Sequence, residues 1–295
     1  MAQPQGKADQ GKADLAYVKM HGAGNDFVMI DGRKLGGVPV DRLQKLAALL
    51  CDRRRGLGAD GIVVLYPAVA GTDGADFEMR YVNASGLPGE MCGNGARCAA
   101  FFAGEIGLAG RKTAFQTDAG MALAEIDGSS VTIEIPPPAE IELELELSLD
   151  IGPRKAIVHK LMVGVPHAVT FVTDVDAHPV EIEGPILRAH PAFPDGCNAN
   201  FLELKGGELR MRTYERGVEA ETLACGTGAV ACAAVSFLLG RAGTPAAVRT
   251  HGGDLLQVAL EYEAPIFRRA VLSGPTEVVA RGEIDGGYLR RHGIL

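Results

Sequence analysis

The sequence lacks several features that would indicate common classes of protein. No apolar run approaches the length of a membrane-spanning helix, so an integral membrane protein is not predicted. There is no Cys-x-x-Cys pair, which argues against a zinc site or a thioredoxin-like redox site. The Gly-rich loop Gly56–Gly61 is not followed by Gly-Lys-Ser/Thr, so it is not a nucleotide-binding loop.

Positive charge and an export signal are also missing. The 295 residues include 29 Lys and Arg against 37 Asp and Glu, and the net charge of −8 disfavours nucleic acid or an acidic membrane surface as a partner. The polar segment Met1–Asp14 is not followed by the apolar h-region of a signal peptide, and we expect residues 1–14 to form a disordered tail. The six cysteines have no disulfide-framework spacing, so a reducing, cytoplasmic location is expected.

Two short stretches of the chain look like copies of each other. Cys92–Ala96 reads Cys-Gly-Asn-Gly-Ala and Cys225–Ala229 reads Cys-Gly-Thr-Gly-Ala, and an alanine-rich run typical of a helix follows each. The glycines let the backbone turn tightly into that helix. Each cysteine is therefore predicted at a helix N-terminus, where free N–H groups bind anions and lower the pKa of a thiol.

Two thiols with two sets of N–H donors fit a racemase or epimerase that needs no cofactor. Inverting a Cα requires a base on one face and an acid on the other, and cysteine can serve as either. The carbanion spreads its charge into the α-carboxylate, which paired helix N-termini would stabilise. One such motif alone would more often be structural, because cysteine is commonly a small buried residue. Cys98 and Cys232, which lie among alanines inside the helices, are predicted to be core.

The elements around the two motifs follow the same order in both halves. A Gly-rich turn between strands, His21–Asp26, has a counterpart in Gly164–His167, and the strand Phe77–Asn83 has one in Leu209–Gly217. With 47% hydrophobic residues and this length, the chain can form two ordinary domains. We therefore infer a duplicated fold with the substrate site between its halves.

Three stretches, in the same order, resemble the diaminopimelate epimerase family from about Ala16 to the C-terminus. They are His21–Phe27, Met91–Cys98, and Tyr214–Gly217 followed by Thr222–Gly228. The resemblance implies an α/β (α+β) fold of two pseudo-symmetric domains, each a small barrel-like β-sheet wrapped around a central helix. It suggests an N-terminal domain of residues 15–117 plus 275–295 and a C-terminal domain of residues 118–274.

The resemblance also implies an activity and a set of site residues. Members of the family interconvert LL- and meso-diaminopimelate on the route to lysine and peptidoglycan, without cofactor or metal. The resemblance also suggests a homodimer. Cys92 and Cys225 would transfer the α-proton, while His167 and Glu215 would tune them. The guanidinium of Arg216 suits a carboxylate bidentately and would hold the distal end of the substrate. The implied substrate-binding residues are Asn25, Asn83, Gly93, Asn94, Asn198, Glu215, Arg216, Gly226 and Thr227.

The sequence departs from the family pattern at three places. Gly61 stands where some members have a glutamine, and Val165 (or Met162 by another alignment) stands where an asparagine is expected before Pro-His. The loop Glu215–Thr222 is one residue longer than in some members. The first two departures remove side-chain donors from the distal half of the site, so the proton-transfer chemistry is better supported than the substrate.

Other interpretations remain open from the sequence. A proline or hydroxyproline epimerase or a histidine racemase of the same fold would have no distal carboxylate for Arg216. A protein that only binds anions or thiols would exchange no α-proton. A pyridoxal phosphate racemase is disfavoured because nothing marks a Schiff-base lysine. Taken alone, Asn83 and Asn198 could be turn residues, and Glu215 with Arg216 an exposed pair.

Overall fold

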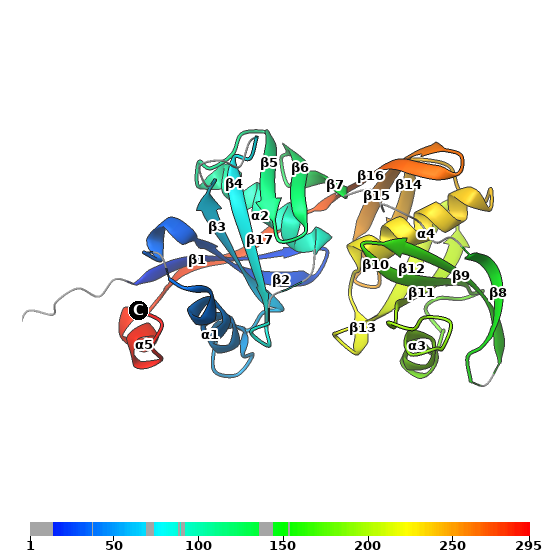
Figure 1. The fold of residues 1–295 in the computed structure, drawn as a ribbon, viewed down its shortest axis with the longest axis horizontal. Helices are drawn as coiled ribbons and strands as arrows, with labels where there is room; N and C mark the ends of the chain where they lie inside the picture. Colours follow the sequence, from blue (N-terminus) through cyan, green and yellow to red (C-terminus); the bar gives the residue numbers. More distant parts are fainter. Residues whose placement is uncertain are drawn as a thin grey trace, which may run out of the picture.

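Strands dominate the molecule and form two lobes, each around one helix (Figure 1). The computed structural model describes residues 14–36, 38–68, 74–87, 89, 92–135, 144–152 and 154–295. Helix α2 (Gly93–Glu105) lies in the first lobe and helix α4 (Gly226–Leu238) in the second. None of the helices in these ranges is long and apolar enough to cross a membrane. The predicted α/β (α+β) fold, with a helix at the centre of each half, is confirmed.

The first half of the chain alternates hairpins with crossover connections. Its strands are β1 (Leu15–Gly22), β2 (Asn25–Asp31), β3 (Gly61–Pro67), β4 (Phe77–Asn83), β5 (Lys112–Thr117), β6 (Gly120–Asp127) and β7 (Ser130–Ile135). The short 3-10 helix η1 (Gly32–Lys34) and helix α1 (Val40–Cys51) connect β2 to β3. Helix α2 connects β4 to β5, so both parallel pairs, β2 with β3 and β4 with β5, have a helical crossover.

The second half repeats this plan. Its strands are β8 (Glu144–Asp150), β9 (Lys155–Val163), β10 (Val165–Phe171), β11 (Asn198–Lys205), β12 (Glu208–Glu215), β13 (Ala220–Thr222), β14 (Ala246–Arg249), β15 (Leu255–Glu263) and β16 (Ile266–Pro275), and a last strand, β17 (Glu277–Ile284), follows them. Helix α3 (Val180–Arg188) connects β10 to β11, and the short helix α5 (Gly286–Arg291) ends the chain. The pairs β10–β11 and β12–β14 are again parallel, and α4 lies in the second crossover. The matching pairings confirm the inferred duplication.

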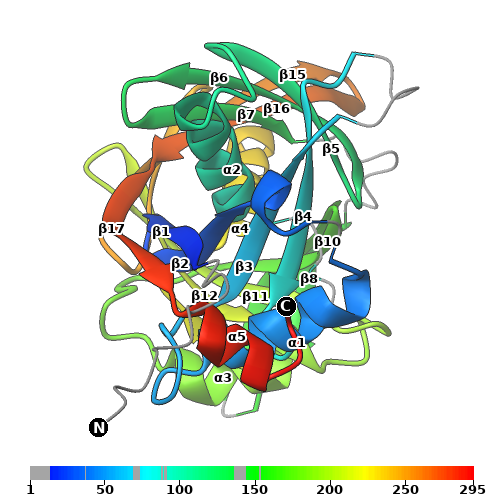
Figure 2. The same ribbon diagram turned by 90° about the vertical axis from the view of Figure 1, so that its left-hand side faces the viewer.

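Two strands cross from one half to the other. Strand β7 pairs with its counterpart β16, which joins the sheets of the two halves. After this junction β8 pairs with β9 in the second half, and β17 returns to pair with β1 in the first (Figure 2). The predicted boundary between the two domains, at residues 117 and 118, lies in the turn of the β5–β6 hairpin. The proposed division into domains stays a prediction. Of the predicted tail only Asp14 lies within the described residues, where its carboxylate accepts a hydrogen bond from the Gly286 N–H.

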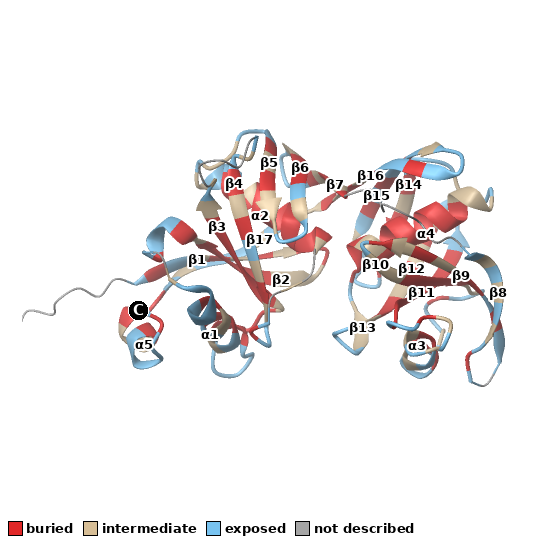
Figure 3. Cartoon of the chain, viewed as in Figure 1, coloured by how far each residue is buried: buried red, intermediate tan, exposed pale blue. Residues whose placement is uncertain are grey.

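The two central helices are buried almost all round because their side chains are small. Alanines on α2 and α4 are fully or nearly fully buried, which lets the surrounding strands approach closely (Figure 3). Cys98 and Cys232 have exposures of 0%, which confirms their prediction as core. This packing fixes the position of each helix N-terminus and therefore of the cysteine that precedes it.

Candidate active site

Each motif cysteine is the N-cap of its helix. The Cys92 Sγ accepts a hydrogen bond from the Gly95 N–H at 3.4 Å, and the Cys225 Sγ accepts one from the Gly228 N–H at 3.3 Å. The N-cap position usually holds Ser, Thr, Asp or Asn, whose side-chain oxygen makes this bond. The two sulfurs therefore have nearly the same local geometry in both halves, and each lies beside the unpaired N–H groups of a first helical turn.

The N-termini of α2 and α4 meet. A methyl group added to Gly226 would lie 3.7 Å from the Cα of Gly93, and Asn94 Nδ2 donates a hydrogen bond to the Ala224 carbonyl at 3.3 Å. We call this region, formed by residues 92–95 and 224–228, the helix junction. The helix junction brings together six of the predicted site residues, namely Cys92, Gly93, Asn94, Cys225, Gly226 and Thr227. Two positive helix ends in one place favour a bound anion.

Cys92 contacts an amide whose orientation is fixed. Its thiol donates a hydrogen bond to Asn25 Oδ1 at 3.3 Å, and Asn25 Nδ2 donates one to Asp60 Oδ2 at 2.6 Å. An ionised carboxylate can only accept, so the Asn25 oxygen must face the sulfur. Arg53 Nη2 donates a hydrogen bond to the other carboxylate oxygen, Asp60 Oδ1, at 2.9 Å. Asp60 was not among the predicted site residues. The only feature of the sequence that could have indicated its role in the site is its position in the Gly-rich loop before β3.

The surroundings of Cys225 consist mainly of donors. Asn198 Oδ1 accepts a hydrogen bond from the Arg216 backbone N–H at 2.8 Å, which turns Asn198 Nδ2 toward the Cys225 Sγ at 3.9 Å. The Thr227 hydroxyl lies 3.5 Å from the same sulfur. The structure therefore brings Asn25, Asn198 and Thr227 to the two thiols, with opposite amide orientations in the two halves.

Burial, and not the helix N-terminus, dominates the acidity of the thiols. Desolvation raises the pKa of Cys92 to about 11, although the Gly95 N–H acts in the opposite direction. Desolvation also raises the pKa of Cys225, and the Glu215 carboxylate adds to the effect. The expectation of a lowered thiol pKa is therefore wrong for the free protein, because loss of hydration outweighs the hydrogen-bond donors at each sulfur.

Glu215 and Asn83 are each the last residue of a strand, β12 and β4. Burial raises the pKa of Glu215, and the charge of Asp60, which belongs to the other half, raises it further. Glu215 also acts electrostatically on both thiols. Asn83 Oδ1 accepts hydrogen bonds from the backbone N–H groups of Ser85 and Leu87, which is a turn conformation. A substrate-binding role for Asn83 stays a prediction.

Comparison with known proteins gives the family. The diaminopimelate epimerase family model matches residues 17–136 and 160–274. The chain belongs to the diaminopimelate epimerase family. It is 38% identical over 285 residues to a diaminopimelate epimerase from Methanothrix thermoacetophila, covering 94% of this chain and 98% of that one. A diaminopimelate epimerase from Chlorobaculum tepidum is 40% identical over 271 residues, covering 90% and 99%.

Solved structures share the fold at much lower identity. A probable proline racemase from Agrobacterium radiobacter superposes with a TM-score of 0.69 at 18% identity, covering 92% of each chain. A hydroxyproline epimerase from Agrobacterium vitis gives the same TM-score and identity, covering 93% of each chain. These structures support the fold of this diaminopimelate epimerase family member and say nothing of its substrate.

One departure from the family pattern has a steric explanation. A Cβ at Gly61 would lie 2.5 Å from Cε2 of Tyr81 and 2.7 Å from the Val82 carbonyl oxygen. The ring of Tyr81 therefore fills the space that a side chain at position 61 would need. Val165 begins β10 opposite Val163 and is half-buried. In this family member an aromatic ring occupies one of the two places where a polar side chain was expected.

His167 is the least hydrated of the predicted tuning residues. It is fully buried on β10, where its Nδ1 lies 3.2 Å from Asn200 Nδ2. Its Nε2 is buried with no hydrogen-bond partner among the described residues. Desolvation lowers the pKa of His167 to about 3, and the charge of Arg216 acts in the same direction. The imidazole is therefore neutral at physiological pH.

The pKa of His167 gives a prediction for stability in acid. Between pH 6.5 and about 3 the unfolded chain binds a proton that folded His167 does not, so this group lowers the unfolding free energy as the pH falls. Its share of the slope is at most about 1.4 kcal/mol per pH unit. We expect His167→Gln to flatten the pH dependence of urea unfolding below pH 6.5. The exposed His292→Gln is the control, and an equal flattening in both variants would contradict the assignment.

Proposed function

We propose that this protein is a cofactor-independent isomerase that converts LL-diaminopimelate to meso-diaminopimelate for lysine and peptidoglycan precursor synthesis. The observation that carries the proposal is the helix junction, where one cysteine from each half caps a helix N-terminus. Family membership supports the substrate. We further propose that the protein acts in the cytoplasm and that it is a homodimer. Sedimentation of the purified protein tests its oligomeric state.

The proposed chemistry uses the two sulfurs in turn. The substrate lies at the helix junction with its α-carboxylate on the N–H groups of Gly93, Asn94, Gly226 and Thr227. One sulfur, as thiolate, removes the α-proton, and the other, as thiol, delivers a proton to the opposite face of the carbanion. The N–H groups stabilise the charge that spreads into the carboxylate. Each turnover leaves the first cysteine protonated and the second deprotonated, ready for the reverse reaction.

The remaining residues prepare this exchange. Because burial favours the protonated form of both thiols, one of them must lose its proton before the reaction begins. We assign this step to Glu215, the carboxylate that acts on both sulfurs and whose own raised pKa makes it a better proton acceptor. Neutral His167 adds no charge of its own beside Asn198, its neighbour in the β10–β11 pair. Asn25, Asn83, Asn198 and Arg216 complete the substrate site.

The test is α-proton exchange in D₂O, followed by NMR with reduced protein and no added cofactor. The substrates offered are LL-diaminopimelate, proline, 4-hydroxyproline and histidine. Deuterium entering only diaminopimelate supports the proposal. Exchange in proline, 4-hydroxyproline or histidine instead would keep the mechanism but overturn the substrate, with Gly61 and Val165 as the marks of changed specificity. No exchange in any of them would favour a protein that binds anions without catalysis.

A further inference from the structure

Arg97 is a buried cation beside the helix junction, and none of the described residues gives it an anionic partner. Its exposure is 0%. Its Nη1 donates a hydrogen bond to the Gly93 carbonyl at 3.3 Å, and its Nη2 donates one to Asn94 Oδ1 at 2.9 Å. The Nε is buried and has no hydrogen-bond partner in the part of the chain that the structure describes. No carboxylate among the described residues pairs with Arg97, and Asp254 acts on it only at longer range.

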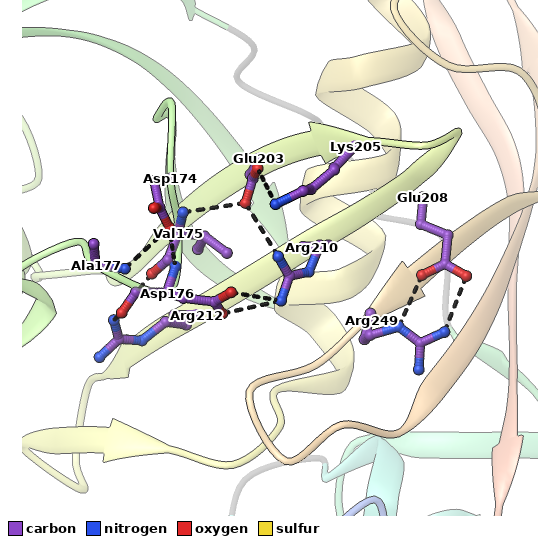
Figure 4. Close-up of polar contacts among 10 residues, drawn as sticks. All are labelled: Asp174, Val175, Asp176, Ala177, Glu203, Lys205, Glu208, Arg210, Arg212 and Arg249. Carbon is purple, nitrogen blue, oxygen red and sulfur yellow. Dashed lines mark hydrogen bonds and ion pairs between the residues drawn. The ribbon is translucent and has the colours of Figure 1, made fainter.

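Such an arrangement is unfavourable by itself. Burial removes the hydration of the guanidinium, which lowers the pKa of Arg97. The side chain points back to the first turn of α2, so its charge lies at the positive end of the helix dipole. Other arginines in this chain have carboxylate partners: Arg210 pairs with Asp176 and Arg249 with Glu208 (Figure 4). The absence of such a partner at Arg97 therefore calls for a reason other than stability.

The duplication shows that a helix opened by this motif can form without an arginine at this position. Arg97 is five positions after Cys92, and the residue five positions after Cys225 is Val230. Val230 is equally buried, with an exposure of 2%, and α4 caps its first turn with Cys225 just as α2 does with Cys92. The positive charge is thus present in one copy of the motif and absent from the other.

We propose that Arg97 is a positioning residue for the proposed epimerase reaction, holding the helix junction electropositive for the substrate carboxylate and aligning the two helix N-termini. The alignment acts through Asn94. Arg97 holds Asn94 Oδ1, which turns Asn94 Nδ2 toward the Ala224 carbonyl of the other half. The charge acts at a distance: a bound α-carboxylate supplies the missing anion, and its charge increases when the α-proton leaves. The effect is therefore larger in the transition state than in the bound substrate.

The test compares Arg97→Met and Arg97→Lys in the full chain, using kcat and KM for diaminopimelate epimerisation and Tm with and without substrate. We expect Arg97→Met to lower kcat by about 100-fold, with a smaller change in KM. Its Tm should be no lower than that of the wild type, because an unpaired buried charge is removed. Arg97→Lys, which keeps the charge, should retain kcat within about tenfold of the wild type. Val230→Ala is the matched control, and it should lower Tm and leave kcat unchanged.

Two results would overturn the proposal. A folded Arg97→Met variant with kcat within threefold of the wild type would remove any electrostatic role. A fall of Tm and kcat together, equal in the Met and Lys variants, would show that Arg97 is only structural. The proposal rests on the proposed function, but the two fail differently. If the wild type exchanges no α-proton of diaminopimelate, the function fails, while a substrate-induced rise in Tm that Arg97→Met abolishes would still support the carboxylate role.

Discussion

Replacing Cys92 or Cys225 with alanine should lower epimerisation of diaminopimelate by about 10³- to 10⁴-fold, the size expected for losing a general acid or base. Each sulfur is the proton-transfer group on one face of the substrate, so neither can stand in for the other. One base can still remove and return a proton on its own face. We therefore expect each variant to exchange the α-proton of one stereoisomer in D₂O without inverting it, and the two variants to act on opposite isomers.

Controls for this result lie in the same two helices. Cys98→Ala and Cys232→Ala remove fully buried thiols that the reaction does not use, and should cost stability but little activity. Cys92→Ser and Cys225→Ser keep an oxygen at the N-cap, where serine is favoured, so these variants should fold well and still be inactive. An equal loss of activity in Cys98→Ala and Cys92→Ala would show that the effect comes from disturbing the helix.

The second large effect is expected at Arg216. Replacing it with alanine should raise the KM for diaminopimelate by about 100-fold, because a charge-assisted bidentate contact to the distal carboxylate is lost. Its backbone N–H, which holds Asn198, is unchanged in this variant, so kcat should fall much less. The KM of Arg216→Lys should lie between those of the wild type and Arg216→Ala, since lysine keeps the charge but not the planar pair of donors. Steady-state kinetics in both directions measure these changes.

The control for Arg216 is a neighbouring arginine. Arg188 pairs with Glu219 on the loop that follows Arg216, at 2.7 Å, and Arg188→Ala should leave KM unchanged. If Arg216→Ala left the KM for diaminopimelate unchanged, the distal carboxylate would have to bind elsewhere. That result would return weight to a substrate with a single carboxylate.

The sequence predicted the centre of the site better than its surroundings. A cysteine, a glycine turn and an alanine-rich helix are local features, so Cys92 and Cys225 could be placed at helix N-termini, where the structure has them. Asp60 and Asn200 contact the site through strand pairing, which local patterns do not specify. The acidity of the thiols was predicted in the wrong direction because it depends on burial, which is a property of the whole fold.

The fold class and the duplication were predictable for a similar reason. Both halves repeat the same order of turns, strands and helices, and a repeated order implies a repeated unit. The sequence shows that Gly61 departs from the family pattern, but only the structure shows that the Tyr81 ring fills the space a side chain at position 61 would need. Arg97 lies in the first motif and Val230 at the matching position of the second, so this difference between the copies is visible in the sequence, but the burial of Arg97 is not.

The pairing of β1 with β17 has a consequence for how the chain is made. Strand β1 is the first of the described strands to be synthesised, but its partner, Glu277–Ile284, is the last of them. The second half has all its strands once β16 is complete at Pro275, so it can fold before the first half closes. This reverses the usual order, in which N-terminal domains fold first during synthesis. A nascent chain stalled before β17 would expose an unpaired edge at β1, which is a site for pairing with another chain.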